Sequence, residues 1–239
     1  MSIKKWLKKI PFPITKNHAY DLQAKRVLKE ALQAHSNCID VGSHEGEFMD
    51  LFLQFAPQGQ HIGFEPLPDF YQQLIQKYPS NCSFHPIALS DKKGETTFNY
   101  VISNPAYSGL EKRRYDKKDE KDTTIKVQQD RLDHILPADL SIDFIKIDVE
   151  GGELQVLQGA MNTLHKWKPT IIFEHGLGAA DVYGTTPEMV FDLLKECGLQ
   201  VNTMKKWLQK EKSYSKHQFC DQYYQNLDYY FIAYCEESY

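Results

Sequence analysis

Short apolar runs alternate with helical patterns along most of this 239-residue chain, and the alternation constrains the fold more than any other feature. Strand-like runs are expected at residues 38–41, 61–64, 83–87, 142–147, 169–173, 199–203 and 229–234. Between them apolar residues recur at helical spacing, as they also do before the first strand, in residues 20–31. Strands that alternate with helices predict a parallel sheet covered on both faces. The sequence therefore predicts an α/β fold.

Four of the expected strands end in acidic residues or glycines. These strand ends lie in segments 39–46, 64–66, 146–153 and 173–176. In open parallel sheets, ligands bind beyond the carboxyl ends of the strands, near the point where the strand order reverses. One such ending is an ordinary loop, but four endings of this kind at the same edge predict a binding site.

The first of these segments is a D-x-G-x-x-x-G turn with Asp40, Gly42 and Gly46 at the spaced positions. Its glycines let the backbone approach a ligand closely. Ser43 and the histidine after it stand where a pyrophosphate-binding turn has its middle glycine. Glu65 follows Gly42 by 23 residues, where an acid can accept hydrogen bonds from both hydroxyls of a ribose. The combination predicts an adenosine ligand without a pyrophosphate, for which S-adenosylmethionine (SAM) is the candidate; the alternative for Glu65 is a solvated strand-end carboxylate.

Segment 144–160, FIKIDVEGGELQVLQGA, closely resembles the signature of the FkbM-type family of SAM-dependent methyltransferases. Other segments fit the same family in the same order: 39–46, 64–66, 88–91 with Gly94, and 131–133. The resemblance covers about residues 36–176. It implies a class I methyltransferase (Rossmann-like) fold, a three-layer sandwich whose seven-stranded, mostly parallel sheet has one antiparallel strand near the C-terminal edge. It also implies methylation of an oxygen, often a sugar hydroxyl in a glycan or natural product.

The resemblance also implies roles for individual residues. The residues expected to line the methionine end of SAM are Asp40, Gly42, Ser43 and Gly46. Those expected beside the adenine are Phe64, Pro66, Ala88, Leu89 and Ser90. Glu65 is expected to hold the ribose, and Asp148 is expected to stand where cofactor and acceptor meet.

Methyl transfer to a hydroxyl needs a base or a metal, because an alcohol is a poor nucleophile until its proton leaves. His175 has the most suitable intrinsic basicity, so we expect it to take the proton while Asp148 orients SAM or the acceptor. Two alternatives stay open: a Mg²⁺ ion on the oxygen ligands of Asp148 and Glu174, which we do not favour, and a purely structural His175. We expect Glu153 to be a first-turn helix acid and Lys146 to form a structural ion pair.

Two segments outside this pattern are expected to border the acceptor. In residues 111–122, eleven of twelve side chains are charged, so the segment cannot form a core; it is either a charged insertion or a lid. Residues 205–224 mix lysines with aromatic rings that suit sugars. We therefore divide the chain into an N-terminal helical cap, 1–35, and a methyltransferase domain, 36–239, with insertions near 102–125 and 205–224. The expected acceptor is a hydroxyl of a carbohydrate, glycoconjugate or related natural product.

Composition disfavours several other classes of protein. The chain is 41% hydrophobic and 25% charged, as in globular proteins, and its net charge of −4 does not favour a nucleic-acid partner. Its five cysteines form no CxxC pair, which indicates reduced thiols in a cytoplasmic protein. The basic segment 1–20 is expected to make at most weak contact with an anionic membrane. Two further alternatives are a nicotinamide oxidoreductase, disfavoured by the missing middle glycine, and a non-catalytic module that binds SAM, nucleic acid or a partner.

Overall fold

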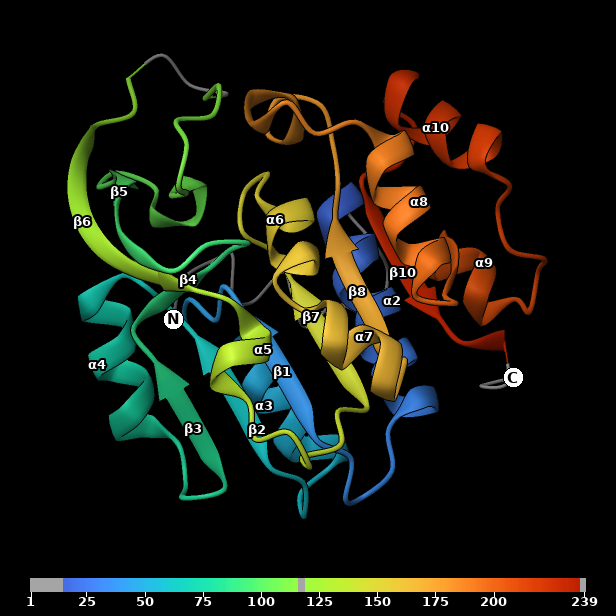
Figure 1. Cartoon of the computed structure of the whole chain (residues 1–239), viewed down its shortest axis with the longest axis horizontal. Helices are drawn as coiled ribbons and strands as arrows, with labels where there is room; N and C mark the ends of the chain where they lie inside the picture. Colours follow the sequence, from blue (N-terminus) through green and yellow to red (C-terminus); the bar gives the residue numbers. More distant parts are fainter. Residues whose placement is uncertain (1–14, 116–118, 237–239) are drawn as a thin grey trace.

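The protein is built around one seven-stranded sheet (Figure 1). The computed structural model describes residues 15–115 and 119–236. The strand order is β3-β2-β1-β7-β8-β10-β9, and β10 is antiparallel to both of its neighbours. The strands are β1 (Cys38–Val41), β2 (His61–Phe64), β3 (Cys82–His85), β7 (Phe144–Ile147), β8 (Thr170–Glu174), β9 (Gln200–Thr203) and β10 (Tyr230–Tyr234). The expected α/β fold with a mostly parallel seven-stranded sheet is therefore confirmed, and each predicted apolar run overlaps one of its strands.

Helices cover both faces of this sheet (Figure 1). One face packs against α2 (Lys16–Ala31), α3 (Glu47–Phe55) and α9 (Met204–Leu208). The other packs against α6 (Glu153–Gln158), α7 (Met161–Trp167), α8 (Pro187–Glu196) and α10 (Lys216–Tyr224). Two more helices, α4 (Pro68–Lys77) and α5 (Leu132–Ile135), pack beside β3 and α7. Because both faces of the central strands are buried, their sequences are apolar almost throughout.

Helix α2 is the first helix of the described residues, and it packs against the sheet with the others. Thr15 caps α2 by accepting a hydrogen bond from the backbone N–H of His18 at 3.1 Å. Val27 and Leu28 are fully buried in the core shared with α3 and α9. The basic residues before Thr15, on which the expected membrane contact rests, lie outside the described residues. None of the helices in the described parts of the chain has the length and hydropathy that a bilayer crossing requires.

A second, three-stranded sheet with the order β4-β6-β5 was not predicted. Its strands are β4 (Ile87–Leu89), β5 (Gly94–Val101) and β6 (Asp122–Asp130). β5 and β6 pair as an antiparallel hairpin, so the charged segment 111–122 is the connection between them, together with the short helix η1 (Pro105–Tyr107). The expected insertion near 102–125 is thus mostly this connection, and its last residues belong to β6.

Residues 205–224 form α9 and α10 and add to the two cores. Trp207, Tyr214 and Tyr223 are each less than 9% exposed. Their faces are covered, which corrects the expectation that they offer flat surfaces to a sugar acceptor.

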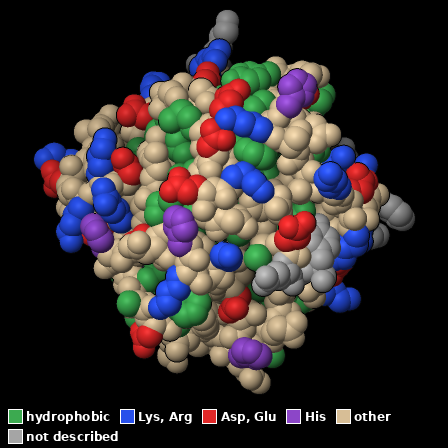
Figure 2. All heavy atoms as spheres, turned by 45° about the vertical axis from the view of Figure 1, so that its right-hand side comes forward, with side chains coloured by type: hydrophobic (Ala, Val, Ile, Leu, Met, Phe, Trp, Pro, Cys, Tyr) green, Lys and Arg blue, Asp and Glu red, His purple; other side chains and the backbone are tan. Residues whose placement is uncertain are grey.

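On the face drawn in Figure 2, basic and acidic side chains are interspersed.

Candidate functional site

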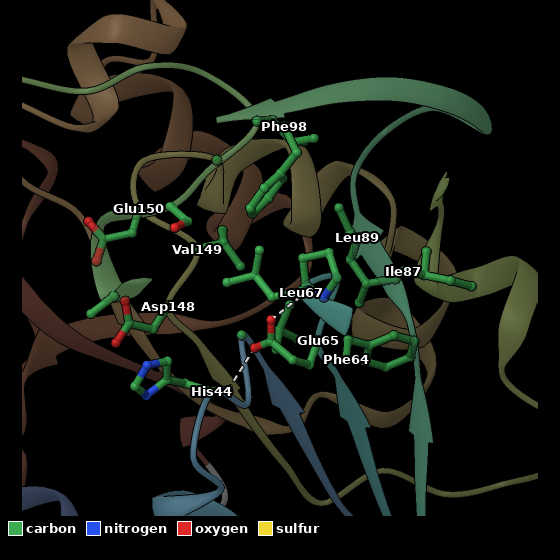
Figure 3. A pocket seen from close by; sticks show the side chains of 18 of the residues that line it. His44, Phe64, Glu65, Leu67, Ile87, Leu89, Phe98, Asp148, Val149 and Glu150 are labelled. Carbon is green, nitrogen blue, oxygen red and sulfur yellow. Dashed lines mark hydrogen bonds between the residues drawn. The ribbon is translucent and has the colours of Figure 1, made fainter. Parts of the chain in front are cut away.

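A hollow of about 640 Å³, counted with the part open to solvent, lies at the carboxyl ends of β1, β2 and β7 (Figure 3). Its walls come from the ends of these strands and from β4, with contributions from β5, from the β5–β6 connection and from Tyr183. The strand order reverses between β1 and β7, so the hollow occupies the switch point at which open parallel sheets bind ligands.

The turn after β1 depends on its two glycines. Gly42 has a φ of +77°, and a Cβ there would lie 2.1 Å from the carbonyl oxygen of Asp148. Gly46 has a φ of +82°, and its Cβ would lie 2.3 Å from the hydroxyl of Tyr78. The amides of Gly42 and Ser43 donate to the carbonyl of Phe64 at 3.0 and 3.1 Å. Only glycine fits these positions, and the turn is fixed to the end of β2.

Glu65 lies at the centre of the hollow with 4% of its surface exposed. Its Oε2 accepts the backbone N–H of His44 at 2.8 Å, and its Oε1 accepts that of Leu67 at 2.9 Å (Figure 3). Burial raises the pKa of Glu65 to about 7, although the two backbone donors and Lys146 oppose the shift. Each carboxylate oxygen can still accept another donor, so the group can receive two hydroxyls of a ribose.

Apolar side chains form the wall beyond Glu65. Of the residues expected beside an adenine, Phe64, Pro66, Ala88 and Leu89 line the hollow. Ser90 does not: it is buried outside the lining, and its hydroxyl donates to Asp91 at 3.1 Å. Leu67 and Phe98 also line the wall, and the sequence had not singled them out. Phe98 reaches the hollow through the unpredicted small sheet, so no local pattern could have revealed it.

Asp40, Ser43 and Gly46 lie outside the lining of the hollow. Asp40 is a register partner of Lys146 across β1 and β7, and the Nζ of Lys146 stands 3.3 Å from its carboxylate. The same Nζ donates to the carbonyl of Gly42 at 2.7 Å. Burial raises the pKa of Asp40 even beside this cation. The ion pair expected for Lys146 is therefore present, and the expectation that Asp40, Ser43 and Gly46 line the site is corrected: they support the turn.

Asp148 and Glu150 lie at the opposite end of the hollow from the apolar wall (Figure 3), and Glu174 lies close to both. One oxygen each from Asp148, Glu150 and Glu174 lies within 4.8 Å of the others. Tyr230, at the start of β10, is the register partner of Glu174, and its hydroxyl donates to Asp148. Burial and the neighbouring Asp148 raise the pKa of Glu174 well above its ordinary value. Among the described residues, these three acids form the group that could hold a metal ion. The sequence had offered Asp148 and Glu174 as possible Mg²⁺ ligands, and the structure adds Glu150 to them.

Glu153 fixes the loop that carries two of these acids. Its fully buried Oε1 accepts the backbone N–H groups of Val149 at 3.2 Å and Gly151 at 3.1 Å. Between them Glu150 adopts a φ of +60°, an unusual conformation for a residue with a side chain. Burial raises the pKa of Glu153 to about 7. Glu153 does lie in the first helical turn, as expected, but its carboxylate serves the loop before the helix.

His175 does not reach the acids. It has no exposed surface, and its ring stacks on those of Tyr223 and Phe219, with centroids 4.7 and 6.0 Å away. Burial lowers its pKa to about 4. Neighbouring residues of a strand point to opposite faces, so Glu174 faces the acid cluster while His175 faces α10. The expectation that His175 takes the acceptor proton is wrong. Its role is the alternative one, a structural histidine packed in the core.

The charged connection between β5 and β6 borders the acid end of the hollow. Arg113 forms an ion pair with Glu150, and Arg114 forms one with Asp181 at 2.7 Å. The backbone N–H of Glu111 donates to the hydroxyl of Tyr183 at 2.9 Å. Asp181 and Tyr183 belong to η2 (Ala180–Tyr183), in the loop after β8. The connection therefore reaches from the small sheet to the loop after β8; whether it is a charged insertion or a lid stays a prediction.

Comparison with known proteins decides the family. The sequence model of the methyltransferase FkbM domain matches residues 40–201. This chain belongs to the FkbM methyltransferase family. The family is one of methyltransferases, and it implies SAM as the methyl donor. No curated protein matches the sequence.

Two solved structures align with this chain. Methyltransferase FkbM from Methylobacillus flagellatus KT aligns with a TM-score of 0.52 and 15% identity, over 85% of this chain and 44% of the other. This chain thus spans less than half the length of that structure. Precorrin-6y C5,15-methyltransferase from Geobacter metallireducens GS-15 aligns with a TM-score of 0.43 and 15% identity, over 76% and 72% of the two chains. The first likeness agrees with the class I methyltransferase architecture of the sheet.

The site residues fit SAM. Gly42 lets the turn lie directly against the loop of Asp148, each oxygen of Glu65 can accept one more donor from a ribose, and the apolar wall can take an adenine. Two residues of the acid end could not be predicted by position: Tyr230 depends on the antiparallel return of β10, and Arg113 on how the charged connection folds.

Proposed function

We propose that this protein is a SAM-dependent O-methyltransferase that acts on a hydroxyl of a carbohydrate, glycoconjugate or related natural product. The observation that carries the proposal is the presence of two carboxylate sites in one hollow. Glu65 stands beside the apolar wall, and Asp148 stands at the acid end with Glu174 and Tyr230 behind it. A cofactor held at Glu65 would therefore meet an acceptor held at Asp148.

When bound, SAM supplies a methyl group on a positively charged sulfur. Glu65 would hold its ribose, and Phe64, Leu67 and Leu89 would enclose its adenine. Positioning of donor and acceptor in line is the main task left to the protein, and it can supply on the order of 7 kcal/mol or more. The glycine turn and the loop of Asp148 are in direct contact, which fixes the two ends of the hollow relative to each other.

Asp148 replaces His175 as the proposed proton acceptor. It lines the hollow, whereas His175 is fully buried elsewhere. Its carboxylate already accepts the hydroxyl of Tyr230, so an incoming hydroxyl can donate to the same group. Glu174 has a raised pKa and therefore tends to keep its proton, which limits the repulsion that an ionised neighbour would exert on Asp148.

The chemistry of the acid end favours a neutral, hydroxyl-rich acceptor. Carboxylates accept hydrogen bonds, and hydroxyl groups donate them, whereas a phosphate would meet like charge. The same argument disfavours a nucleic-acid substrate. The five cysteines, none of them in a disulfide, fit the proposed cytoplasmic location.

Binding and transfer can be tested separately. Calorimetry on Glu65→Ala should show SAM affinity reduced about tenfold or more, because two charge-assisted hydrogen bonds are lost. Glu95→Ala, on the exposed side of β5, is the matched control and should bind normally. Unchanged affinity in Glu65→Ala would refute the ribose assignment.

The acceptor class is tested with labelled SAM and a panel of cell glycans. The label should enter a glycan hydroxyl, and a deletion strain should lack one methyl increment in the mass of the same glycan. Label found on nitrogen, carbon or nucleic acid instead would contradict the proposal of O-methylation.

A further inference from the structure

Arg113 places a guanidinium against Glu150, one of the three carboxylates of the acid cluster. Its Nη1 donates to Glu150, and the two side chains retain only 14% and 12% of their exposed area. Lys112 and Arg114, its neighbours in the charged connection, are 61% and 78% exposed and pair with Asp122 and Asp181 near the surface. Arg113 is therefore the member of this cationic triplet that turns inward.

The surroundings of Arg113 hold it in place and leave one donor open. The guanidinium carbon lies 4.8 Å from the centroid of the Tyr107 ring, a cation–π distance. The Nε–H is buried and has no hydrogen-bond partner among the described residues. A buried donor without a partner is costly, so this edge is suited to an oxygen supplied by a ligand.

The carboxylates next to Arg113 are those that could otherwise hold a divalent cation. One oxygen each from Asp148, Glu150 and Glu174 lies within 4.8 Å of the others. Mg²⁺ needs nearly octahedral oxygen coordination, and a guanidinium on Glu150 both occupies one of these ligands and adds a positive charge to the cluster. An arginine guanidinium stays positively charged in proteins.

We propose that Arg113 is the resident cation of this cluster, and that it holds the acceptor oxygen through its free Nε–H in place of a metal. The methyl-transfer part of this inference rests on the proposed function. The acceptor oxygen takes the methyl group from the sulfonium, whose C–S bond breaks to leave a neutral thioether, and the hydroxyl proton passes to Asp148. Arg113 stabilises the negative charge that grows on the oxygen, so the transfer needs no divalent ion.

A metal-binding experiment tests the first half without any acceptor. Manganese alone is titrated into the full-length protein and followed by electron paramagnetic resonance. The wild type should show no saturable site, and Arg113→Met should gain one that disappears in the Arg113→Met, Asp148→Asn double variant. Arg114→Met removes a neighbouring arginine whose ion pair is exposed, and it should resemble the wild type.

Two outcomes of the titration would overturn the inference. One is a saturable manganese site in the wild type that is lost in Asp148→Asn. The other is an Arg113→Met protein with an unchanged melting temperature that still binds no manganese. Arg113→Lys keeps a positive charge, so it should also lack the site if charge is what excludes the ion.

Transfer assays test the second half. Wild-type turnover should be the same in EDTA and in Mg²⁺, and Arg113→Met should lower kcat roughly tenfold to a hundredfold while SAM affinity changes little. Guanidinium ions should restore part of that loss, and they should have no such effect on Arg114→Met. Turnover abolished by EDTA would overturn the inference. If no acceptor is methylated at all, the proposed function fails, while the manganese titration still decides whether Arg113 is the resident cation.

Discussion

The two carboxylate sites of the hollow are held by different kinds of partner. Glu65 accepts two backbone N–H groups, from His44 in the turn after β1 and from Leu67 in the loop after β2. The acid cluster is held by side chains: Tyr230 donates to Asp148, and Arg113 pairs with Glu150. With Glu174, these side chains come from four segments spread between residues 113 and 230.

The difference in partners implies a difference in behaviour. Backbone donors do not titrate and have few ways to rearrange, so Glu65 is a fixed acceptor before any ligand arrives. The acid cluster combines like charges, a phenol and a guanidinium, so its protons can redistribute when an acceptor binds. The first arrangement suits the binding of a constant cofactor, and the second suits proton transfer.

The largest effect is expected where the two sites touch. Gly42→Ala would place a Cβ 2.1 Å from the carbonyl oxygen of Asp148 at a φ of +77°, so the turn or the loop must move. We expect a loss of SAM binding by calorimetry and a stability loss of about 2–4 kcal/mol in denaturant unfolding. Gly184→Ala has a similar φ of +67° but no neighbouring atom within 4 Å, and it should cost about 1–2 kcal/mol with binding intact. Equal effects of the two substitutions would show that the contact with Asp148 is unimportant.

The sequence predicted the main sheet well because its strands are short, buried and separated by helices. The same reasoning missed β6, whose residues DTTIKVQQD are largely polar and follow a charged run. A strand of this composition is stabilised by its partners, here β5 and β4, and those pairings connect residues far apart in the chain.

The candidate site was predictable to a smaller extent. Glu65 was found because strand-end acids keep a regular spacing from the glycine turn. His175 was chosen for its basicity, but a strand places it and Glu174 on opposite faces, so only one of them could face the cluster. Tyr230 and Arg113 depend on the antiparallel pairing of β10 and on the path of a connection, which no local pattern encodes.

Asp148 should carry the next largest effect, confined to the acid end. Asp148→Asn removes the proposed proton acceptor but keeps the side-chain shape, so kcat should fall about 10²–10⁴-fold while SAM affinity changes far less. His175→Phe is the matched control: the ring stacks on Phe219 and Tyr223 and does not line the hollow, so turnover should be largely kept. A strong loss of turnover in His175→Phe together with a normal Asp148→Asn enzyme would return the proton-accepting role to the histidine.

The smallest expected effect concerns the protonation of Glu65. Its pKa of about 7 leaves the carboxyl mostly protonated at pH 6 and ionised at pH 8.5. Ribose hydroxyls donate to the ionised form, so binding should release roughly one proton at pH 6 and almost none at pH 8.5, with affinity about tenfold weaker at the lower pH. Calorimetry in buffers of different ionisation enthalpy measures the released proton directly. Glu153 also has a pKa of about 7 but serves only its own loop, so Glu153→Gln should release the same proton. Binding without proton release at pH 6 would mean that the cofactor does not use the ionised Glu65, and the fixed acceptor would then be no more than a support for the turn.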